Sequence, residues 1–358
     1  MQVRSMDSIG TWNVVVQLDG TSMDMEPFVV REAVDLGRHL PADARGVIQL
    51  RRSGRSPASQ RWLGRLELAA APLGIAAAAG AAQGLGLNPL GAAAAASAIA
   101  LWAWRDGRKR LQANRFDLHR EPAWSGTRTY VTRGPSKGLG VPAESRPSAA
   151  APDAQELAGR LAWPARYRVL VVSGHRKANR VGGIDLSELN TALESARKQT
   201  GRKTDLLVLE GCRTADLGLL EPLAGGARYA LVSQDTLWAP GLPWPHVLDR
   251  HPADPEALAR QLVEAAGGLP GVPTLSLIDL ERLPELQRCL KALPPQAGRA
   301  LAEARGFGAG LHDLGDFLAR LGPDPAVRRC RELLSQAVIA QKVTEELAGL
   351  ASGLSVGG

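Results

Sequence analysis

The sequence predicts an α/β fold in which helices cover both faces of an open, mostly parallel sheet. Apolar strands are expected at 167–175, 205–212 and 228–235, each with the near-continuous aliphatic content of a strand buried on both faces. Helical segments at about 185–199 and 214–224 separate them, which is the alternation typical of a parallel sheet. Apolar residues make up 45% of the 358 residues, which is enough for a large core.

Two N-terminal segments are expected to extend this sheet. Residues 11–20 (TWNVVVQLDG) have the pattern of a strand ending in a turn, and an amphipathic helix follows at about 24–40. Residues 46–52 and 128–133 are predicted to pair as a hairpin whose connecting loop holds an insert. The chain then divides into 1–55 as the first part of the sheet domain, 56–120 as the insert, 121–280 as the rest of that domain, and 281–358 as a helical C-terminal subdomain.

The insert contains a long apolar run. Residues 68–104 carry no charge, and arginines and lysines flank them on both sides. A bilayer span needs about 20 apolar residues, so the run could hold one span or two short ones. Since strands from both sides are expected in one sheet, both flanks must share a compartment, which favours a transmembrane helical hairpin at about 66–104. The basic flanks predict the inner (cytoplasmic) membrane, with the catalytic domain in the cytoplasm; a soluble or surface-lying helical hairpin is the alternative.

Charge and cysteine content exclude several classes of protein. The net charge is +7, but the cations cluster beside the apolar run and not along an aromatic-bearing face, so no nucleic-acid partner is predicted. The three cysteines, Cys212, Cys289 and Cys330, have no motif-like spacing, which argues against a disulfide framework, against a zinc site and for a reducing compartment. Cys289 and Cys330 are expected as buried residues of amphipathic helices. The first 30 residues show no signal peptide.

Three consecutive predicted strands end in polar, reactive residues. The strand ends read Ser173-Gly174-His175, Glu210-Gly211-Cys212 and Ser233-Gln234-Asp235. Sites in sheets of this kind form beyond the carboxyl ends of the strands, so these residues are predicted to gather at one edge.

A cysteine beside a histidine can act as a nucleophile, because the imidazole takes the thiol proton and the thiolate attacks. Gly174 and Gly211 precede His175 and Cys212 and would let a substrate backbone approach closely. The main-chain N–H of Cys212 could join an oxyanion hole. The residues alone leave open the alternative of a small buried cysteine near an incidental histidine.

These motifs resemble the clostripain family of cysteine peptidases, which has a caspase-like fold. WNVVVQLDG is similar to the family's first strand, YRVLVVSGH to its strand with the catalytic histidine, and KTDLLVLEGCRTADLGLLEPL to the strand and helix around its catalytic cysteine. RYALVSQDTLWAPGLPWPHVL resembles the family segment Ser-Glu-Glu-Thr-x-Pro-Gly-x-Gly-Trp-Pro-Tyr. The resemblance covers most of the chain outside the insert. It implies a caspase-like sheet flanked by helices, interrupted by the apolar helical hairpin.

The resemblance also assigns roles to residues. His175 would be the base and Cys212 the nucleophile of an endopeptidase that cleaves after Arg or Lys. The family's substrate-reading acid lies two residues before the cysteine, where this chain has Glu210, and Asp235 is a second candidate for the same pocket. Ser233 could line that pocket, as could Trp238 or Trp244. The bland alternative for Glu210 is a solvated loop acid or an ion pair with the nearby Arg213.

The chain departs from the family pattern after the histidine. Arg176, Lys177 and Ala178 stand where the family usually has Gly-Gly, which puts the geometry of that rim in question. Some family members cut themselves at a basic residue in this region, and Lys177 or Arg180 could serve; the loop is also short enough for a single-chain enzyme. The resemblance allows calcium as an activator, but the sequence predicts no cofactor and no metal site.

The sequence therefore predicts a bacterial, membrane-tethered cysteine endopeptidase that acts on protein or peptide substrates through His175 and Cys212. One alternative is a catalytically silent, caspase-like scaffold at the membrane, which the altered loop after His175 favours. Another is a protease effector in bacterial stress or anti-phage cell death, on family analogy alone. The physiological substrate, the trigger and the oligomeric state do not follow from the sequence.

Overall fold

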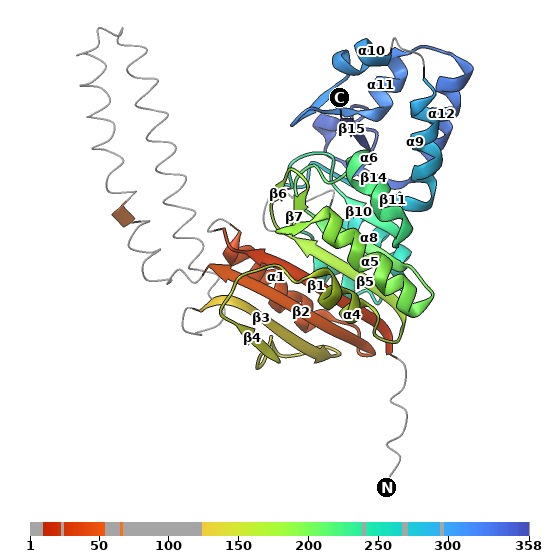
Figure 1. Ribbon diagram of the computed structural model, residues 1–358. Coiled ribbons are helices and arrows are strands. Elements are labelled where there is room, and N and C mark those ends of the chain that lie inside the picture. The colour runs from red at the N-terminus through yellow and green to blue at the C-terminus, as the bar shows by residue number, and fades with distance from the viewer. Residues whose placement is uncertain are drawn as a thin grey trace, which may run out of the picture.

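The computed structural model describes residues 10–22, 25–53, 65–66, 124–237, 241–266, 271–293 and 297–357. Its centre is a mixed sheet (Figure 1). Within the described residues this sheet is built, in chain order, from β1 (Gly10–Gly20), β2 (Ala44–Ser53), β3 (Ser125–Arg133), β4 (Glu144–Arg146), β5 (Ala165–Ser173), β9 (Thr204–Glu210), β10 (Ala227–Val232), β11 (Thr274–Asp279) and β14 (Val338–Val343). Their spatial order is β14-β11-β10-β9-β5-β1-β2-β3-β4.

The middle of the sheet is parallel and both edges are antiparallel. β2, β1, β5, β9 and β10 run side by side in the same direction, as the alternation of strands and helices predicts. β3 pairs antiparallel with β2, which confirms the predicted pairing of two strands on either side of the insert. At the other edge, β11 and β14 are also antiparallel. β14 lies in a region predicted to be mostly helical, because a short edge strand has too few buried residues to leave a clear apolar pattern.

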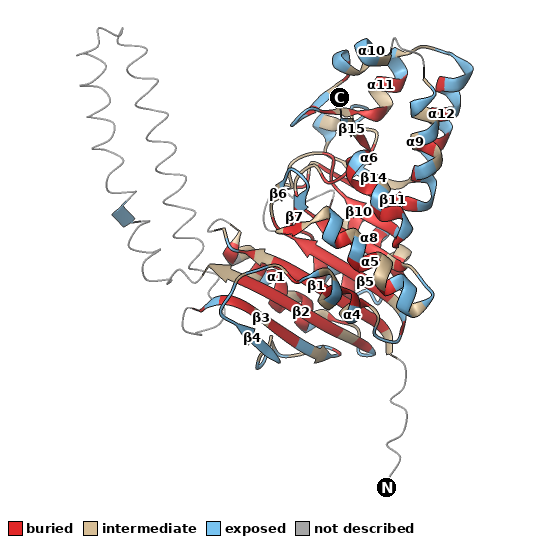
Figure 2. Cartoon of the chain, in the orientation of Figure 1, coloured by how far each residue is buried: buried red, intermediate tan, exposed pale blue. Residues whose placement is uncertain are grey.

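Helices cover both faces of the sheet, and central strands such as β5 contribute to two separate cores. On β5, Val169 and Val171 pack against one face, while Leu170 and Val172 pack against the other. Since successive side chains of a strand alternate between faces, a strand buried on both faces must be apolar at nearly every position. Figure 2 shows the sheet strands as the most continuously buried part of the molecule.

The first face is covered by α1 (Glu26–His39), α7 (Trp244–Leu248) and α8 (Pro255–Ala266). The second face is covered by α4 (Ala154–Leu161), α5 (Leu186–Thr200), the short α6 (Leu217–Leu220) with η2 (Glu221–Gly225), η3 (Leu280–Arg282), α9 (Leu283–Lys291), α11 (Leu314–Arg320) and α12 (Pro325–Ala337). Two further helical segments in the described part of the chain are α10 (Ala297–Glu303) and η4 (Glu345–Leu347).

Two small sheets lie beyond the carboxyl ends of the central strands. The first joins β6 (Arg176–Lys177), β7 (Arg180–Val181) and β8 (Ile184–Asp185) directly after β5. The second joins β12 (Gly306–Gly308), β13 (Leu311–Asp313) and β15 (Ser355–Gly357). A buried Gln234 side chain ties this second sheet to the end of β10, since it donates to Asp313 at 3.0 Å and accepts from Gly353 N–H at 2.7 Å.

Cys289 on α9 and Cys330 on α12 form a disulfide, with their Cα atoms 5.7 Å apart. The sequence-based argument against a disulfide framework does not hold for this pair, and the expectation of a reducing compartment loses its support. Pairing requires two Cβ atoms to face each other across helices that are 41 residues apart in the chain, and residue spacing does not show this. Cys212 is the free cysteine.

The predicted inner-membrane location is contradicted and is not retained. Among the described ranges, no helix is long and apolar enough to cross a bilayer. The transmembrane hairpin predicted at about 66–104 lies outside the described residues except at Leu66. The prediction relied on the composition of that run and on its basic flanks.

Candidate active site

The register of the parallel strands brings the two central strand ends together. Ser173 of β5 is paired with Glu210 of β9, and the Gly174 N–H donates to the Glu210 carbonyl at 3.0 Å. His175 and Cys212 each follow that pair by two residues, so they leave the sheet from neighbouring strand ends. Both are partly exposed, whereas the strand residues before them are buried.

Gly174 occupies a position that no other residue would fit. Its φ is +144°, and a Cβ would lie 2.8 Å from the Asp19 Cβ and 2.9 Å from the Gly182 Cα. Gly211 is less restricted, since its Cβ would lie 3.1 Å from the Gly174 carbonyl oxygen. Both glycine N–H groups are already bonded, that of Gly211 to the Leu209 carbonyl at 3.0 Å. The close approach at Gly174 explains why the chain before His175 carries no side chain.

The segment after His175, residues 176–185, is the small sheet β6-β7-β8, which we call the His loop. Its Gly182 N–H donates to the His175 carbonyl at 3.1 Å. From below, the buried Arg51 of β2 donates to the Gly182 carbonyl and lies 3.1 Å from the Asp19 carboxylate of β1. The His loop therefore rests on the ends of β1 and β2 and is not a free-standing turn.

The segment after Cys212, residues 213–216, is a tight turn that we call the Cys loop. Arg213 has a left-handed φ of +57°, and its N–H donates to the Asp235 carbonyl at 2.9 Å. The Thr214 hydroxyl is buried against the Leu209 carbonyl at 3.1 Å. The Cys212 Sγ itself lies 3.8 Å from the Leu237 carbonyl oxygen. These bonds fix the turn that displays the thiol.

Arg176 does not stand free at the rim of the site. Its guanidinium donates to the Arg213 carbonyl and to the Asp216 carboxylate, the latter at 2.6 Å. The cation that replaces a family glycine therefore binds the Cys loop. Lys177 and Arg180, the predicted self-cleavage residues, are exposed and pair with each other across the β6-β7 hairpin.

Glu210 is buried, which differs from a solvated loop acid and from an ion pair with Arg213. Its side chain accepts from the indole N–H of Trp244 at 2.7 Å and from the Leu242 N–H. Gly241, with a φ of +84°, would place a Cβ 2.9 Å from the other carboxylate oxygen. Gly241, Leu242 and Trp244, which follow β10 in the chain, therefore enclose Glu210.

A second carboxyl group, which sequence reasoning missed, lies against Glu210. Glu32 of α1 is buried and accepts from the Ser173 hydroxyl at 2.9 Å. Burial raises the pKa of Glu210 to about 7, and burial together with the Glu210 charge raises the pKa of Glu32 well above its ordinary value. Glu32 is therefore the protonated member of the pair, and its O–H donates a hydrogen bond to Glu210. The sequence carries a signal for this, since Glu32 falls between Val29 and Leu36 on the buried face of α1.

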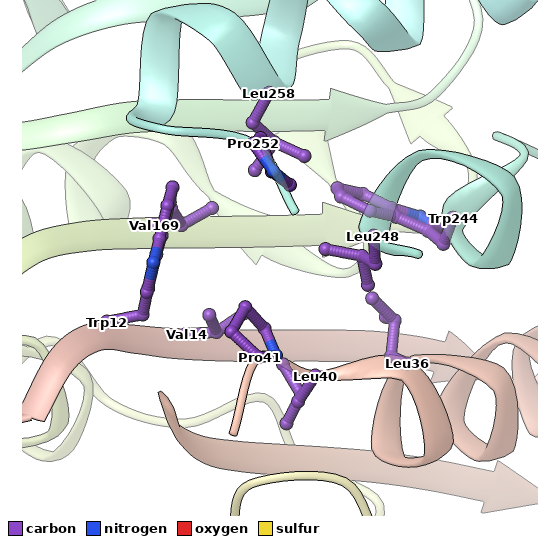
Figure 3. Close-up of a pocket in the computed structure, with 10 residues that line it drawn as sticks. All are labelled: Trp12, Val14, Leu36, Leu40, Pro41, Val169, Trp244, Leu248, Pro252 and Leu258. Carbon is purple, nitrogen blue, oxygen red and sulfur yellow. The ribbon is translucent and has the colours of Figure 1, made fainter. Parts of the chain in front are cut away.

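An apolar cavity of about 10 Å³ lies on the other side of Trp244 (Figure 3). Such a volume is at the limit for one water molecule, and apolar walls leave a water without partners. It is a packing gap and not a substrate pocket. Its lining residues are Trp12, Val14, Leu36, Leu40, Pro41, Val169, Trp244, Leu248, Pro252 and Leu258.

The third strand end contributes less than predicted. Ser233 is fully buried, and its hydroxyl lies 2.8 Å from the Thr274 carbonyl, so it lines no open pocket. Asp235 is partly exposed, and one of its oxygens accepts from the Thr236 N–H at 2.6 Å. Trp238 lies outside the described residues. The described residues hold no group of three or more side chains suited to a metal ion.

A cysteine and a histidine at adjacent carboxyl ends of a helix-covered parallel sheet define a caspase-like arrangement. The fold is similar to that of an inactive zymogen C11 protease from Parabacteroides distasonis, with 12% identity, a TM-score of 0.63, and 98% of this chain and 93% of that chain covered. It is also similar to a secreted C11 cysteine protease from Bacteroides thetaiotaomicron.

That Bacteroides protease has two structures in the comparison. One has 12% identity, a TM-score of 0.63 and coverage of 98% of this chain and 94% of that chain. The other, in complex with an irreversible peptide inhibitor, has 12% identity, a TM-score of 0.57 and coverage of 97% and 92%. No family model and no curated protein sequence matches the chain. The structural likeness confirms the predicted caspase-like fold of clostripain-type proteases.

Proposed function

We propose that the chain is a cysteine endopeptidase of the clostripain type, with Cys212 as nucleophile and His175 as base. The observation that supports this proposal is the pairing of the ends of β5 and β9, because His175 and Cys212 follow these neighbouring strand ends in a fold similar to that of C11 proteases. A free, partly exposed thiol at a strand end is suited to attack, unlike the paired Cys330, which is fully buried.

In this reaction the Cys212 thiol gives its proton to the His175 imidazole, and the thiolate attacks the scissile carbonyl. The imidazolium then protonates the leaving amine, which departs as the C–N bond breaks and an acyl-enzyme remains. Water, deprotonated by His175, releases the acid product and restores the thiol. Because the Gly174 and Gly211 N–H groups are already bonded, the Cys212 N–H is the candidate main-chain donor to the oxyanion.

Cleavage after Arg or Lys is the proposed specificity, and Glu210 supports it. Glu210 lies two residues before Cys212, and the partly exposed Asp235 follows the neighbouring strand β10. A cationic side chain that reached Glu210 would stabilise its ionised form, and each charge-assisted hydrogen bond contributes about 1.5–3 kcal/mol. The described groups that bond to the Glu210 carboxyl group are Trp244, Leu242 and Glu32. None of them is a cation that would compete with a substrate side chain.

The test is hydrolysis of fluorogenic peptides that differ only in Arg, Lys or Gln before the scissile bond. Cys212→Ala and His175→Ala should each lower kcat/KM by at least ~10³-fold, since members of a catalytic unit fail together. Glu210→Gln should lower the Arg-to-Gln preference and leave the thiol reactive toward iodoacetamide. Wild-type activity in Cys212→Ala would refute the proposal, and an unchanged Arg preference in Glu210→Gln would refute only the specificity.

A further inference from the structure

Arg176 connects the two loops that carry the proposed dyad. It is the first residue of the His loop, directly after His175, and its side chain is mostly buried. One guanidinium nitrogen donates to the Arg213 carbonyl, directly after Cys212 in the Cys loop, and another lies 2.6 Å from an Asp216 oxygen. One side chain thus spans from the residue next to His175 to the turn that follows Cys212.

Asp216 is built to receive this guanidinium. Its Oδ1 accepts from the Gly218 N–H at 3.0 Å and caps α6, while its Oδ2 binds Arg176. The Cys loop before Asp216 is fixed to the end of β10, because the Ala215 N–H donates to the Ser233 carbonyl at 2.9 Å. With both oxygens of Asp216 in use, the carboxylate has a fixed direction and Arg176 meets a rigid acceptor.

The other end of the connection is also rigid. The His loop is a three-stranded sheet, and its Gly182 carbonyl is held by the buried Arg51. Arg176 itself pairs with Val181 in that sheet, which fixes its main chain. A contact between two rigid parts sets their separation, whereas a contact to a mobile loop would only follow its motion.

We propose that Arg176 is a positioning residue that sets the separation and orientation of His175 and Cys212 by binding the Arg213 carbonyl and the Asp216 carboxylate at once. This inference rests on the proposed function and adds the residue that fixes the position of His175 relative to Cys212. A proton passes between thiol and imidazole only within hydrogen-bond reach, so a misplacement of about 1 Å can lower the rate by about 10²-fold. The planar fork of Arg suits two acceptors, and a Lys ammonium satisfies them with poorer geometry.

The experiment compares Arg176→Gln, Arg176→Lys, Asp216→Asn and the Gln/Asn double variant. For each, kcat and KM for the Arg peptide, the rate of Cys212 alkylation by iodoacetamide at pH 7.5 and the Tm are measured. Since Cys289 and Cys330 are bonded to each other, alkylation reports on Cys212 alone. Asn at 216 keeps the oxygen that caps α6 and turns an N–H₂ toward Arg176, so it breaks the connection with little change to the helix.

We expect Arg176→Gln and Asp216→Asn each to lower kcat by ~10–100-fold with KM changed less than about threefold. Arg176→Lys should recover part of the loss, and the double variant should be no worse than either single one, because both remove the same connection. Alkylation of Cys212 should slow in parallel with kcat. The matched control is Arg197→Gln, which removes an exposed Arg–Glu pair on α5 and should leave kcat unchanged.

A kcat within twofold of wild type in folded Arg176→Gln and Asp216→Asn overturns the inference, and so do additive losses in the double variant. If Arg176→Lys loses as much kcat and as much Tm as Arg176→Gln, Arg176 contributes only to stability. These outcomes are separate from those for the dyad. If Cys212→Ala is inactive while Arg176→Gln is fully active, the positioning role is refuted and the proposed protease function still holds.

Discussion

The two buried carboxyl groups predict a pH dependence of stability that one substitution should remove. Replacing Glu32 by Gln reproduces the protonated acid: its carbonyl oxygen can accept from the Ser173 hydroxyl, and its N–H₂ can donate to Glu210. The change deletes a titrating group and keeps its hydrogen bonds and volume. We therefore expect Glu32→Gln to fold and to differ from wild type mainly in how its stability depends on pH.

The sign and size follow from the raised pKa values. A carboxyl group whose pKa is raised in the folded state stabilises it fully below the unfolded value, near 4.5, and loses that contribution as pH rises to the folded value. The loss is about 1.4 kcal/mol per pH unit. Because the pKa of folded Glu32 is raised well above its ordinary value, this loss accumulates over the pH range in which folded Glu32 is still protonated and unfolded Glu32 is already ionised.

The assay is urea unfolding of wild type and Glu32→Gln at pH 5, 6, 7 and 8, in the Cys212→Ala background to prevent self-cleavage. The variant should match wild type within about 1 kcal/mol at pH 5, and its advantage should then grow by up to about 1.4 kcal/mol for each pH unit. Glu264→Gln, at an exposed position of α8, is the control and should show no such trend. A difference that stays constant from pH 5 to 8 would mean that Glu32 is ionised in the folded protein and would refute the reasoning.

Two further predictions concern single contacts. Replacing both Cys289 and Cys330 by Ser should lower the free energy of unfolding by up to about 4 kcal/mol, from the chain entropy of a loop of 41 residues, with Cys212 alkylation unchanged; urea unfolding and iodoacetamide kinetics check this. Trp244→Phe removes the indole donor that lowers the pKa of Glu210, so a smaller fraction of Glu210 should be ionised at pH 7. KM for the Arg peptide should therefore rise more than KM for the Gln peptide. Equal changes in both KM values would contradict the second prediction.

Strand positions and strand ends were predictable because they depend on local pattern. The aliphatic runs that end at Ser173 and Glu210 fit strands buried on both faces, and parallel neighbours must present their carboxyl ends at one edge. The placement of His175 and Cys212 after neighbouring strand ends followed from that rule. The helix with Glu32 was also predictable, but its acid on the apolar face passed unnoticed.

The contacts that surround the dyad were not predictable, because each joins residues far apart in the chain with no local signal. Glu32 of α1 meets Glu210 of β9 on one face of the sheet, and Cys289 of α9 meets Cys330 of α12. A second cause is that the sequence alone predicts a charged loop residue to be exposed to solvent, because its partner is distant in the chain. Arg176 was expected at the rim of the site for this reason and instead binds the Cys loop.

By itself, then, the sequence determined the order of strands and helices, the parallel centre of the sheet and the reactive residues at its edge, since periodicity and length act within one segment. Tertiary structure alone decided the antiparallel edge formed by β11 and β14, the disulfide, the burial of Glu210 against Glu32 and the ion pair between Arg176 and Asp216. Those features depend on register and on the direction of side chains between segments. Such relations arise only when the separate segments pack against one another.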